Sequence, residues 1–250
     1  MGTILALANQ KGGVGKTTTA VNLAACLAEA GGRTLVVDLD PQANATSGLG
    51  ESANGTSCYD LLDGAPVDEV AHATRFTNLD LVPSRPELAG AAVEVSRREG
   101  GESFLASALA PARDRYAYVF VDCPPSLGPL TVNGLAAADR VLVPVQCEYY
   151  ALEGLAQLLN SIELVRTRLN PRLAVAGMLL TMVDARTRLA ADVAAEVRRH
   201  FGDLVFDTVV PRSVRLAEAP SHGLPITSYD PASAGADAYF RVASELVERA

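Results

Sequence analysis

The chain has 250 residues, of which 49 % are hydrophobic, and its formal net charge is −8. This length is typical of one α/β domain with a large core, so we expect a single domain over residues 1–250. The negative net charge excludes a uniformly basic nucleic-acid binder. The chain has neither an apolar run long enough to span a membrane nor a signal-peptide pattern. Its four cysteines lack the spacing of a disulfide framework or a metal site.

A glycine-rich stretch at residues 9–18 follows a short apolar strand, residues 4–8, and precedes a helix expected over about residues 17–30. Glycines in such a turn let backbone N–H groups curl around an anion, because no Cβ blocks the approach. Lys16 can reach the β- and γ-phosphates of a nucleotide, the Thr17 hydroxyl can bind Mg²⁺, and Thr18 can donate to a further phosphate oxygen. The residues expected to surround the phosphates are Lys11, Gly12, Gly13, Val14, Gly15, Lys16, Thr17 and Thr18.

The loop departs from the ordinary P-loop pattern at one position. That pattern has Gly six residues before the lysine, where this chain has Gln10. A second lysine, Lys11, opens the loop instead, and Lys11 and Lys16 are the only lysines among 21 basic residues. From the residues alone, Lys11 could contact its own nucleotide or a nucleotide bound by a second subunit.

The second expected strand, residues 34–37, ends in two carboxylates, Asp38 and Asp40. In open α/β sheets, ligands bind at the carboxyl ends of the strands. Asp40 could therefore orient a water molecule in line with a γ-phosphate, although a carboxylate before Pro41 could also be a structural turn residue. We expect Asp38 to hold the loop, or the ion indirectly.

Residues 43–101 show a weaker pattern. Clustered Asn, Ser and Gly residues at 44–55 indicate a loop. We then expect a strand at residues 79–83 and short helices at residues 59–62, 88–95 and 103–109.

The clearest later strand, residues 118–122, is an apolar run that ends in Asp122. A carboxylate in this position beside the glycine-rich loop can hold Mg²⁺ through water, together with Thr17.

Strands and helices continue to alternate after Asp122. Strands are expected at residues 141–145 and 173–182, with short or bent strands at 204–206 and 208–210. Helices are expected at residues 127–138, 149–169, 189–201 and 236–249. This alternation predicts an α/β fold of the P-loop NTPase type, with a mostly parallel twisted sheet and helices on both faces.

Residues 11–18 resemble the deviant Walker A box of the ParA/MinD ATPases, and the chain from about residue 4 to the last helix resembles the chromosomal ParA branch, also called Soj. The resemblance implies a weak, Mg²⁺-dependent ATPase in which Asp40 positions the attacking water. It implies an ATP-sandwich homodimer in which Lys11 reaches the partner's phosphates. It also implies that Pro211 and Ser213 line the adenine, with Ser213 standing where the family usually has Asn.

The same resemblance implies non-specific binding of double-stranded DNA through Arg186 and Arg215, release when a ParB-type partner stimulates hydrolysis, and a nucleoid-associated place in the cytoplasm. Some members of the branch also act on DnaA. Residues 160–215 hold nine arginines and six acidic residues, which leaves a local positive excess on an acidic chain. Exposed arginines are nevertheless often only solvated or ion-paired.

Two other functional classes are weighed against this one. A MinD-like, membrane-recruited ATPase needs a basic amphipathic C-terminal helix, but residues 239–250 contain two Arg and two Glu, so we expect no stable membrane binding. An iron–sulfur carrier needs paired bridging cysteines, and Cys123 has no suitable mate.

Overall fold

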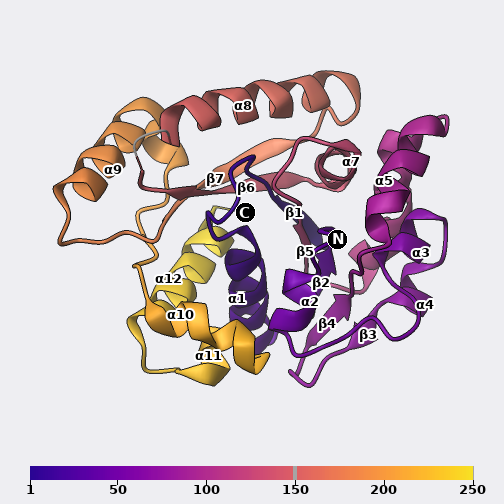
Figure 1. The fold of residues 1–250 in the computed structure, drawn as a ribbon, viewed down its shortest axis with the longest axis horizontal. Coiled ribbons are helices and arrows are strands. Elements are labelled where there is room, and N and C mark those ends of the chain that lie inside the picture. Colours follow the sequence, from indigo (N-terminus) through magenta and orange to yellow (C-terminus); the bar gives the residue numbers. More distant parts are fainter. Residues whose placement is uncertain (149–150, 250) are drawn as a thin grey trace.

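The computed structural model describes residues 1–148 and 151–249. Its centre is a seven-stranded sheet in the order β3-β4-β2-β5-β1-β6-β7 (Figure 1). The strands are β1 (Thr3–Leu7), β2 (Thr34–Asp38), β3 (His72–Ala73), β4 (Leu79–Val82), β5 (Tyr118–Asp122), β6 (Arg140–Gln146) and β7 (Ala174–Thr181). All neighbouring pairs are parallel except β3 and β4. The predicted α/β fold with a mostly parallel sheet is confirmed.

The helices cover both faces of this sheet. The α-helices are α1 (Lys16–Glu29), α2 (Asn44–Gly48), α3 (Cys58–Leu62), α4 (Val67–Val70), α5 (Leu88–Arg97), α6 (Phe104–Leu109), α7 (Pro129–Ala137), α8 (Ala151–Arg168), α9 (Arg188–Phe201), α10 (Val214–Glu218), α11 (Ile226–Tyr229) and α12 (Ala234–Glu248). Short 3₁₀ segments are η1 (Gly101–Ser103), η2 (Pro111–Asp114), η3 (Gly202–Leu204) and η4 (Ala219–His222).

Two apolar cores result, one on each face. One core joins α5, α7 and α8 to the sheet, and the other joins α1, α10, α11 and α12 (Figure 1). Small side chains such as Ala20 and Ala24 are fully buried on α1, which lets that helix lie close to the strands. The described part of the chain holds no helix that is long and apolar enough to cross a bilayer.

Several predicted elements are wrong. Residues 44–48, predicted as loop, form the helix α2. Residues 204–206 and 208–210 are not strands, because within them only Val205 forms a β-bridge, an isolated one to Met178. The short elements α4, β3, α10 and α11 were not predicted. The predicted helix start at Tyr149 lies outside the described residues.

The parallel register brings the polar strand ends together. Asp38 at the end of β2 is the direct neighbour of Asp122 at the end of β5. Leu7, the last residue of β1, pairs with Asp122 on the other side of β5. The glycine-rich loop that follows β1 therefore starts at the same edge as both carboxylates.

Candidate functional site: a phosphate cradle at the strand ends

The glycine-rich loop joins β1 to α1. Gly13 and Gly15 adopt left-handed backbone angles, with φ of 73° and 87°, which L side chains rarely adopt. Gly15 is the N-cap of α1, and its carbonyl accepts the N–H of Thr19 at 2.9 Å. Val14 is buried, and its carbonyl accepts the Thr181 hydroxyl at 2.8 Å, which ties the loop to the end of β7. The loop is therefore curled around a helix N-terminus, which is a favourable place for an anion.

Lys16 is the buried cation of this cradle. Its side chain curls back, so that Nζ donates to the carbonyl of Lys11 at 3.3 Å. Burial lowers the pKa of Lys16, while the nearby charge of Asp122 opposes that change. A buried ammonium with one weak hydrogen bond suits an anionic ligand, because phosphate oxygens would supply the missing acceptors.

Asp122 is fully buried, and neither carboxylate oxygen has a hydrogen-bond partner. Burial, followed by the charge of Asp38, raises its pKa well above the usual value; the approach of the Thr17 hydroxyl and the charge of Lys16 act in the opposite direction. The Thr17 hydroxyl nevertheless lies outside the geometry of a hydrogen bond to either Asp122 oxygen. Unpaired carboxylate oxygens beside a threonine hydroxyl fit Mg²⁺, which prefers oxygen ligands and keeps several waters.

Asp38 anchors the segment after β2. Of the two roles predicted for it, holding the loop and holding the ion indirectly, its contacts correspond to the first. One of its oxygens accepts the backbone N–H of Thr46 at 2.8 Å and the Thr46 hydroxyl at 2.7 Å. The other accepts the N–H of Asp40 at 3.2 Å. These bonds fix the start of α2 against the strand end.

Asp40 lies in the same cavity as the cradle. Asp40 is 7 % exposed, and one of its carboxylate oxygens accepts the N–H of Gln42 at 3.0 Å. The cavity of about 400 Å³ is lined by Gly12, Lys16, Thr17 and Thr18 from the loop and by Asp40. Both proposals for Asp40, a turn residue and a group facing a phosphate, are compatible with this position.

A second cavity of about 270 Å³ adjoins the first and is lined by Pro211, Ser213 and Tyr239. The two cavities share Gly15, Thr18 and Met182. The Ser213 hydroxyl accepts the N–H of Leu216 at 3.4 Å and so caps α10. The residues predicted to line the base, Pro211 and Ser213, therefore border a cavity that adjoins the cradle.

Met182 was missed by the sequence reasoning. It follows β7 and has a left-handed φ of 52°, which is strained for a residue with a long side chain. The terminal methyl of Met182 lies 3.8 Å from the point that a Cβ on Gly15 would occupy. Met182 therefore lies where the two cavities meet. In the sequence it is one more apolar residue at a strand end, and no signal distinguishes it.

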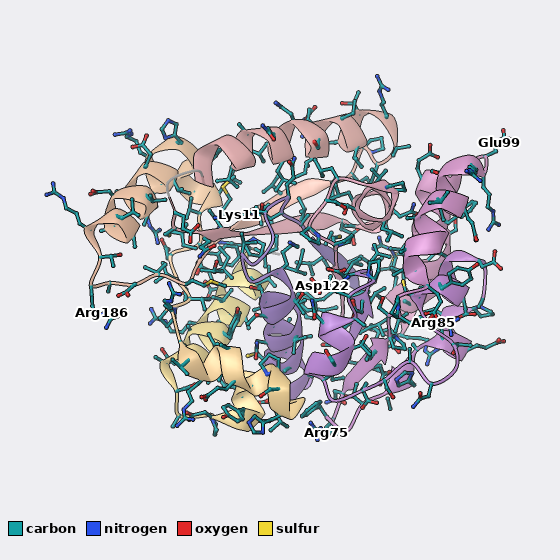
Figure 2. The ribbon with its side chains drawn as sticks, in the orientation of Figure 1. Lys11, Arg75, Arg85, Glu99, Asp122 and Arg186 are labelled. Carbon is teal, nitrogen blue, oxygen red and sulfur yellow. The ribbon has the colours of Figure 1, made fainter. Side chains whose placement is uncertain are left out.

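Lys11, in contrast to Lys16, is 45 % exposed and forms an ion pair with Glu148. The second oxygen of Glu148 accepts the side-chain amide of Gln146 at 2.7 Å. Glu148 follows β6 and lies 137 residues from Lys11 in sequence. Figure 2 shows Lys11 in the loop that precedes α1.

Arg186 lies in the segment that precedes α9, and Arg215 lies in the first turn of α10. The segments that lead into these two helices run side by side, because Val183 bridges to Pro211 and its carbonyl accepts the N–H of Arg212 at 3.1 Å. Arg186 is 89 % exposed and extends from the edge of the molecule (Figure 2). Its guanidinium donates to both oxygens of Asp184, at 2.9 and 2.8 Å, which lowers the pKa of that carboxyl.

Arg215 is 57 % exposed and is ion-paired with Glu218 at 3.1 Å and with Asp230 at 3.4 Å. Both arginines are thus accessible but already paired with acids of their own chain.

Comparison with known proteins gives consistent matches. Residues 2–175 match a family described as an AAA domain. The chain is 55 % identical to the sporulation initiation inhibitor protein Soj of Bacillus subtilis, over 98 % of each chain. It is 56 % identical to the chromosome-partitioning ATPase Soj of Thermus thermophilus, over 98 % of this chain and 95 % of that protein.

Solved structures share the fold. The structure of cobyrinic acid a,c-diamide synthase from Mycobacterium smegmatis with bound ATP analogue and magnesium is 38 % identical, covers 99 % of this chain and 95 % of its own, and superposes with a TM-score of 0.87. The cell division ATPase MinD of Pyrococcus furiosus superposes with a TM-score of 0.84 over the full length of both chains, at 24 % identity, and shows the fold alone.

Proposed function

The chain belongs to the Soj/ParA family of chromosome-partitioning ATPases and is an ATP-hydrolysing enzyme, and we propose that its ATP-bound form is a dimer that binds DNA without sequence preference. The observation that carries the ATPase chemistry is the buried, unpartnered carboxylate of Asp122 beside the cradle of Lys16. The partitioning role rests on the relatives named above.

The nucleotide is ATP with Mg²⁺. The cofactors bound in the Mycobacterium smegmatis structure, an ATP analogue and magnesium, support this assignment. The loop residues from Gly12 to Thr18 surround the phosphates, Thr17 and Asp122 hold the ion, and Pro211 and Ser213 line the base. When bound, Mg²⁺ neutralises charge on the β- and γ-phosphates.

Hydrolysis requires a water molecule in line with the γ-phosphate. Asp40 orients that water and accepts its proton as the oxygen attacks phosphorus and the bond to the β-phosphate oxygen breaks. Lys16 stabilises the negative charge that moves onto the leaving ADP. The low exposure of Asp40 and its place in the cradle cavity support this role.

Lys11 acts on the nucleotide of a second subunit. Its exposure, and the fact that it does not line the cradle cavity, support a role outside its own cradle. By analogy with an arginine finger given in trans, the ammonium both holds the dimer on ATP and accelerates hydrolysis. Loss of the γ-phosphate then weakens the dimer.

Arg186 and Arg215 bind DNA phosphates in the dimer. Their exposure and the adjacency of the segments that lead into α9 and α10 support this proposal. Because dimerisation doubles the number of phosphate contacts, only the ATP form has high affinity. A ParB-type partner stimulates hydrolysis and releases the dimer, and the net charge of −8 suits a partner that presents a basic segment.

The test measures DNA binding with ATP, with ADP and without nucleotide, for the wild type and three variants. We expect Asp40→Ala to stay dimeric and DNA-bound, Gly12→Val to stay monomeric, and Arg186→Ala to dimerise without binding DNA. A Cβ at Gly12 would lie 3.9 Å from that of Pro125, so a side chain there tests the dimer contact more than the fold of one subunit. Equal DNA retention by the wild type with and without ATP would refute the switch.

The membrane-recruited alternative is tested in the same series by liposome sedimentation. In α12 the apolar side chains of Tyr239, Val242 and Leu246 are buried in the core, so they do not form a membrane-binding face. ATP-dependent pelleting with liposomes would overturn the DNA proposal in favour of that class.

A further inference from the structure

Ser84 lies two residues after β4, the strand that pairs with β2. Because the two strands are parallel, Ser84 reaches the same sheet edge as Asp38 and Asp40. Ser84 is 2 % exposed, and its hydroxyl donates to the backbone carbonyl of Asp40 at 2.7 Å. This bond joins segments that are 44 residues apart in sequence.

The Ser84 hydroxyl belongs to a closed ring of hydrogen bonds. The N–H of Ser84 donates to the Thr46 hydroxyl at 2.9 Å, and that hydroxyl donates to Asp38 at 2.7 Å. Asp38 in turn accepts the N–H of Asp40 at 3.2 Å. The main chain of Asp40 is therefore held on both sides, by Asp38 at its amide and by Ser84 at its carbonyl.

The turn that carries Asp40 is strained. The Asp40 carbonyl also accepts the N–H of Ala43 at 2.9 Å, which closes the turn, and Ala43 has a left-handed φ of 54°. This conformation is unfavourable for alanine, because its Cβ comes too close to the following carbonyl oxygen. Such a conformation persists only where surrounding contacts hold it. Without the Ser84 hydroxyl, the carbonyl keeps one partner, but the turn loses its contact with β4.

We propose that Ser84 is a positioning residue for ATP hydrolysis, which holds the backbone of Asp40 so that its carboxylate faces the water in line with the γ-phosphate. The proposal rests on the role of Asp40 proposed above. Ser84 does not line the cradle cavity, so it acts through Asp40. Misplacing a catalytic group by about 1 Å can cost about 10²-fold in rate.

The experiment measures steady-state ATP hydrolysis by Ser84→Ala, with Thr34→Val as the matched control. Thr34 also has a buried hydroxyl that donates to a backbone carbonyl, that of Gly32 at 2.9 Å, but it lies at the opposite end of β2. For Ser84→Ala we expect kcat to fall about tenfold or more while KM for ATP changes less than about twofold, because the phosphate cradle is untouched. Thr34→Val should keep the wild-type kcat.

A second pair of variants guards against a general loss of stability. Thr46→Ser keeps the hydroxyl that bridges Ser84 and Asp38, whereas Thr46→Val removes it. We expect Thr46→Ser to retain kcat and Thr46→Val to lose it as Ser84→Ala does, with thermal unfolding confirming that each variant is folded. If Ser84→Ala does not fold, this pair decides the question.

The outcomes separate the two proposals. If Asp40→Ala hydrolyses ATP like the wild type, the role proposed for Asp40 is wrong, and the role of Ser84 falls with it. If Asp40→Ala is inactive but Ser84→Ala turns over no more slowly than Thr34→Val, the role of Ser84 alone is wrong. Equal kcat for Thr46→Ser and Thr46→Val would overturn it as well.

Discussion

Asp122 and Asp38 are neighbouring carboxylates that differ in how their charge is compensated. Asp38 accepts three hydrogen bonds from its own loop, whereas Asp122 accepts none. A buried acceptor without a partner costs free energy, and its raised pKa expresses that cost. Asp122 is therefore a group whose environment is completed only by a cation, and Asp38 is a structural anchor.

Asp122→Asn tests this difference. The substitution removes the charge that burial and Asp38 disfavour, so we expect the free energy of unfolding of the nucleotide-free protein to rise by about 1 kcal/mol. Mg²⁺-dependent ATP hydrolysis should be lost in the same variant. Denaturant unfolding and a phosphate-release assay measure the two effects.

Asp139→Asn is the matched control for that variant. Asp139 accepts the N–H of Ile4 at 2.8 Å and pairs with Arg113 at 2.6 Å, so neutralising it should lower stability. If Asp122→Asn is destabilised as much as Asp139→Asn, the account of Asp122 as an uncompensated charge is wrong.

Glu148 holds the ammonium that we assign to the partner's nucleotide. Glu148→Gln removes the ion pair with Lys11, so the dimer should form at a lower ATP concentration. The pair is about half exposed and so is worth at most about 1 kcal/mol, which limits the shift to about fivefold. Light scattering during an ATP titration, in an Asp40→Ala background that prevents turnover, measures the shift.

Glu163→Gln supplies the comparison for this titration. Glu163 forms an exposed ion pair with Arg166 on α8, so the variant makes the same change of charge at a different place. An equal shift in both variants would indicate a general charge effect, and no shift in Glu148→Gln would show that the ion pair does not restrain Lys11.

At the scale of elements, α2 shows why composition misled. Asn, Ser and Gly favour a loop, and the residue before the helix, Ala43, provides no side-chain cap. The helix forms because Asp38, on the preceding strand, accepts the N–H of Thr46 in its first turn. A cap supplied by another element leaves no local pattern, so the sequence alone could not predict it.

The same reasoning separates the site residues that were predicted from those that were not. The glycine-rich loop and Asp122 follow local patterns, a strand followed by glycines and an apolar run that ends in a carboxylate. Glu148 and Ser84 contact their partners across 137 and 44 residues. Such contacts depend on the strand order, which the alternation of elements does not specify.

The N-terminal end of the sheet is held by a cluster that joins three strands, away from the cradle. The Tyr116 hydroxyl donates to Asp80 at 2.7 Å, and Arg33 pairs with the same carboxylate at 3.0 Å. Burial, together with the bond to Asp80, raises the pKa of Tyr116 to about 12 from 10.0. The cluster therefore favours the neutral phenol in the folded state.

A pH dependence of stability follows from this shift. Below pH 10 the phenol of Tyr116 is protonated in both the folded and the unfolded state. From about pH 10 to 12 the unfolded chain loses this proton while the folded chain keeps it. The free energy of unfolding therefore falls as pH rises through that window. Tyr116→Phe should remove this component and lower stability at pH 7 by about 1 kcal/mol. Unfolding curves at pH 7 and pH 11 measure both effects, and an unchanged alkaline slope in the variant would contradict the assignment.

At the scale of the whole molecule, a chain with a negative net charge can still bind DNA if its exposed arginines lie together at one end. Arg186 precedes α9 and Arg215 belongs to α10, whereas α5 lies at the opposite end of the molecule (Figure 1). Each of the two arginines is paired with an acid, so DNA phosphates must compete with Asp184 or Glu218. We therefore expect one subunit to bind DNA weakly and two subunits on one duplex to bind it well.

The salt dependence of DNA affinity tests this reasoning quantitatively. Each neutralised phosphate contributes about −0.9 to the slope of log K against log salt concentration. Arg186→Ala removes one contact in each of two subunits, so with ATP its slope should be shallower than that of the wild type by about 2. Arg97→Ala, an exposed arginine at the end of α5, should leave the slope unchanged and serves as control. A shallower slope in both variants would show that net charge, not a defined face, governs binding; an unchanged slope in Arg186→Ala would place the DNA elsewhere on the dimer.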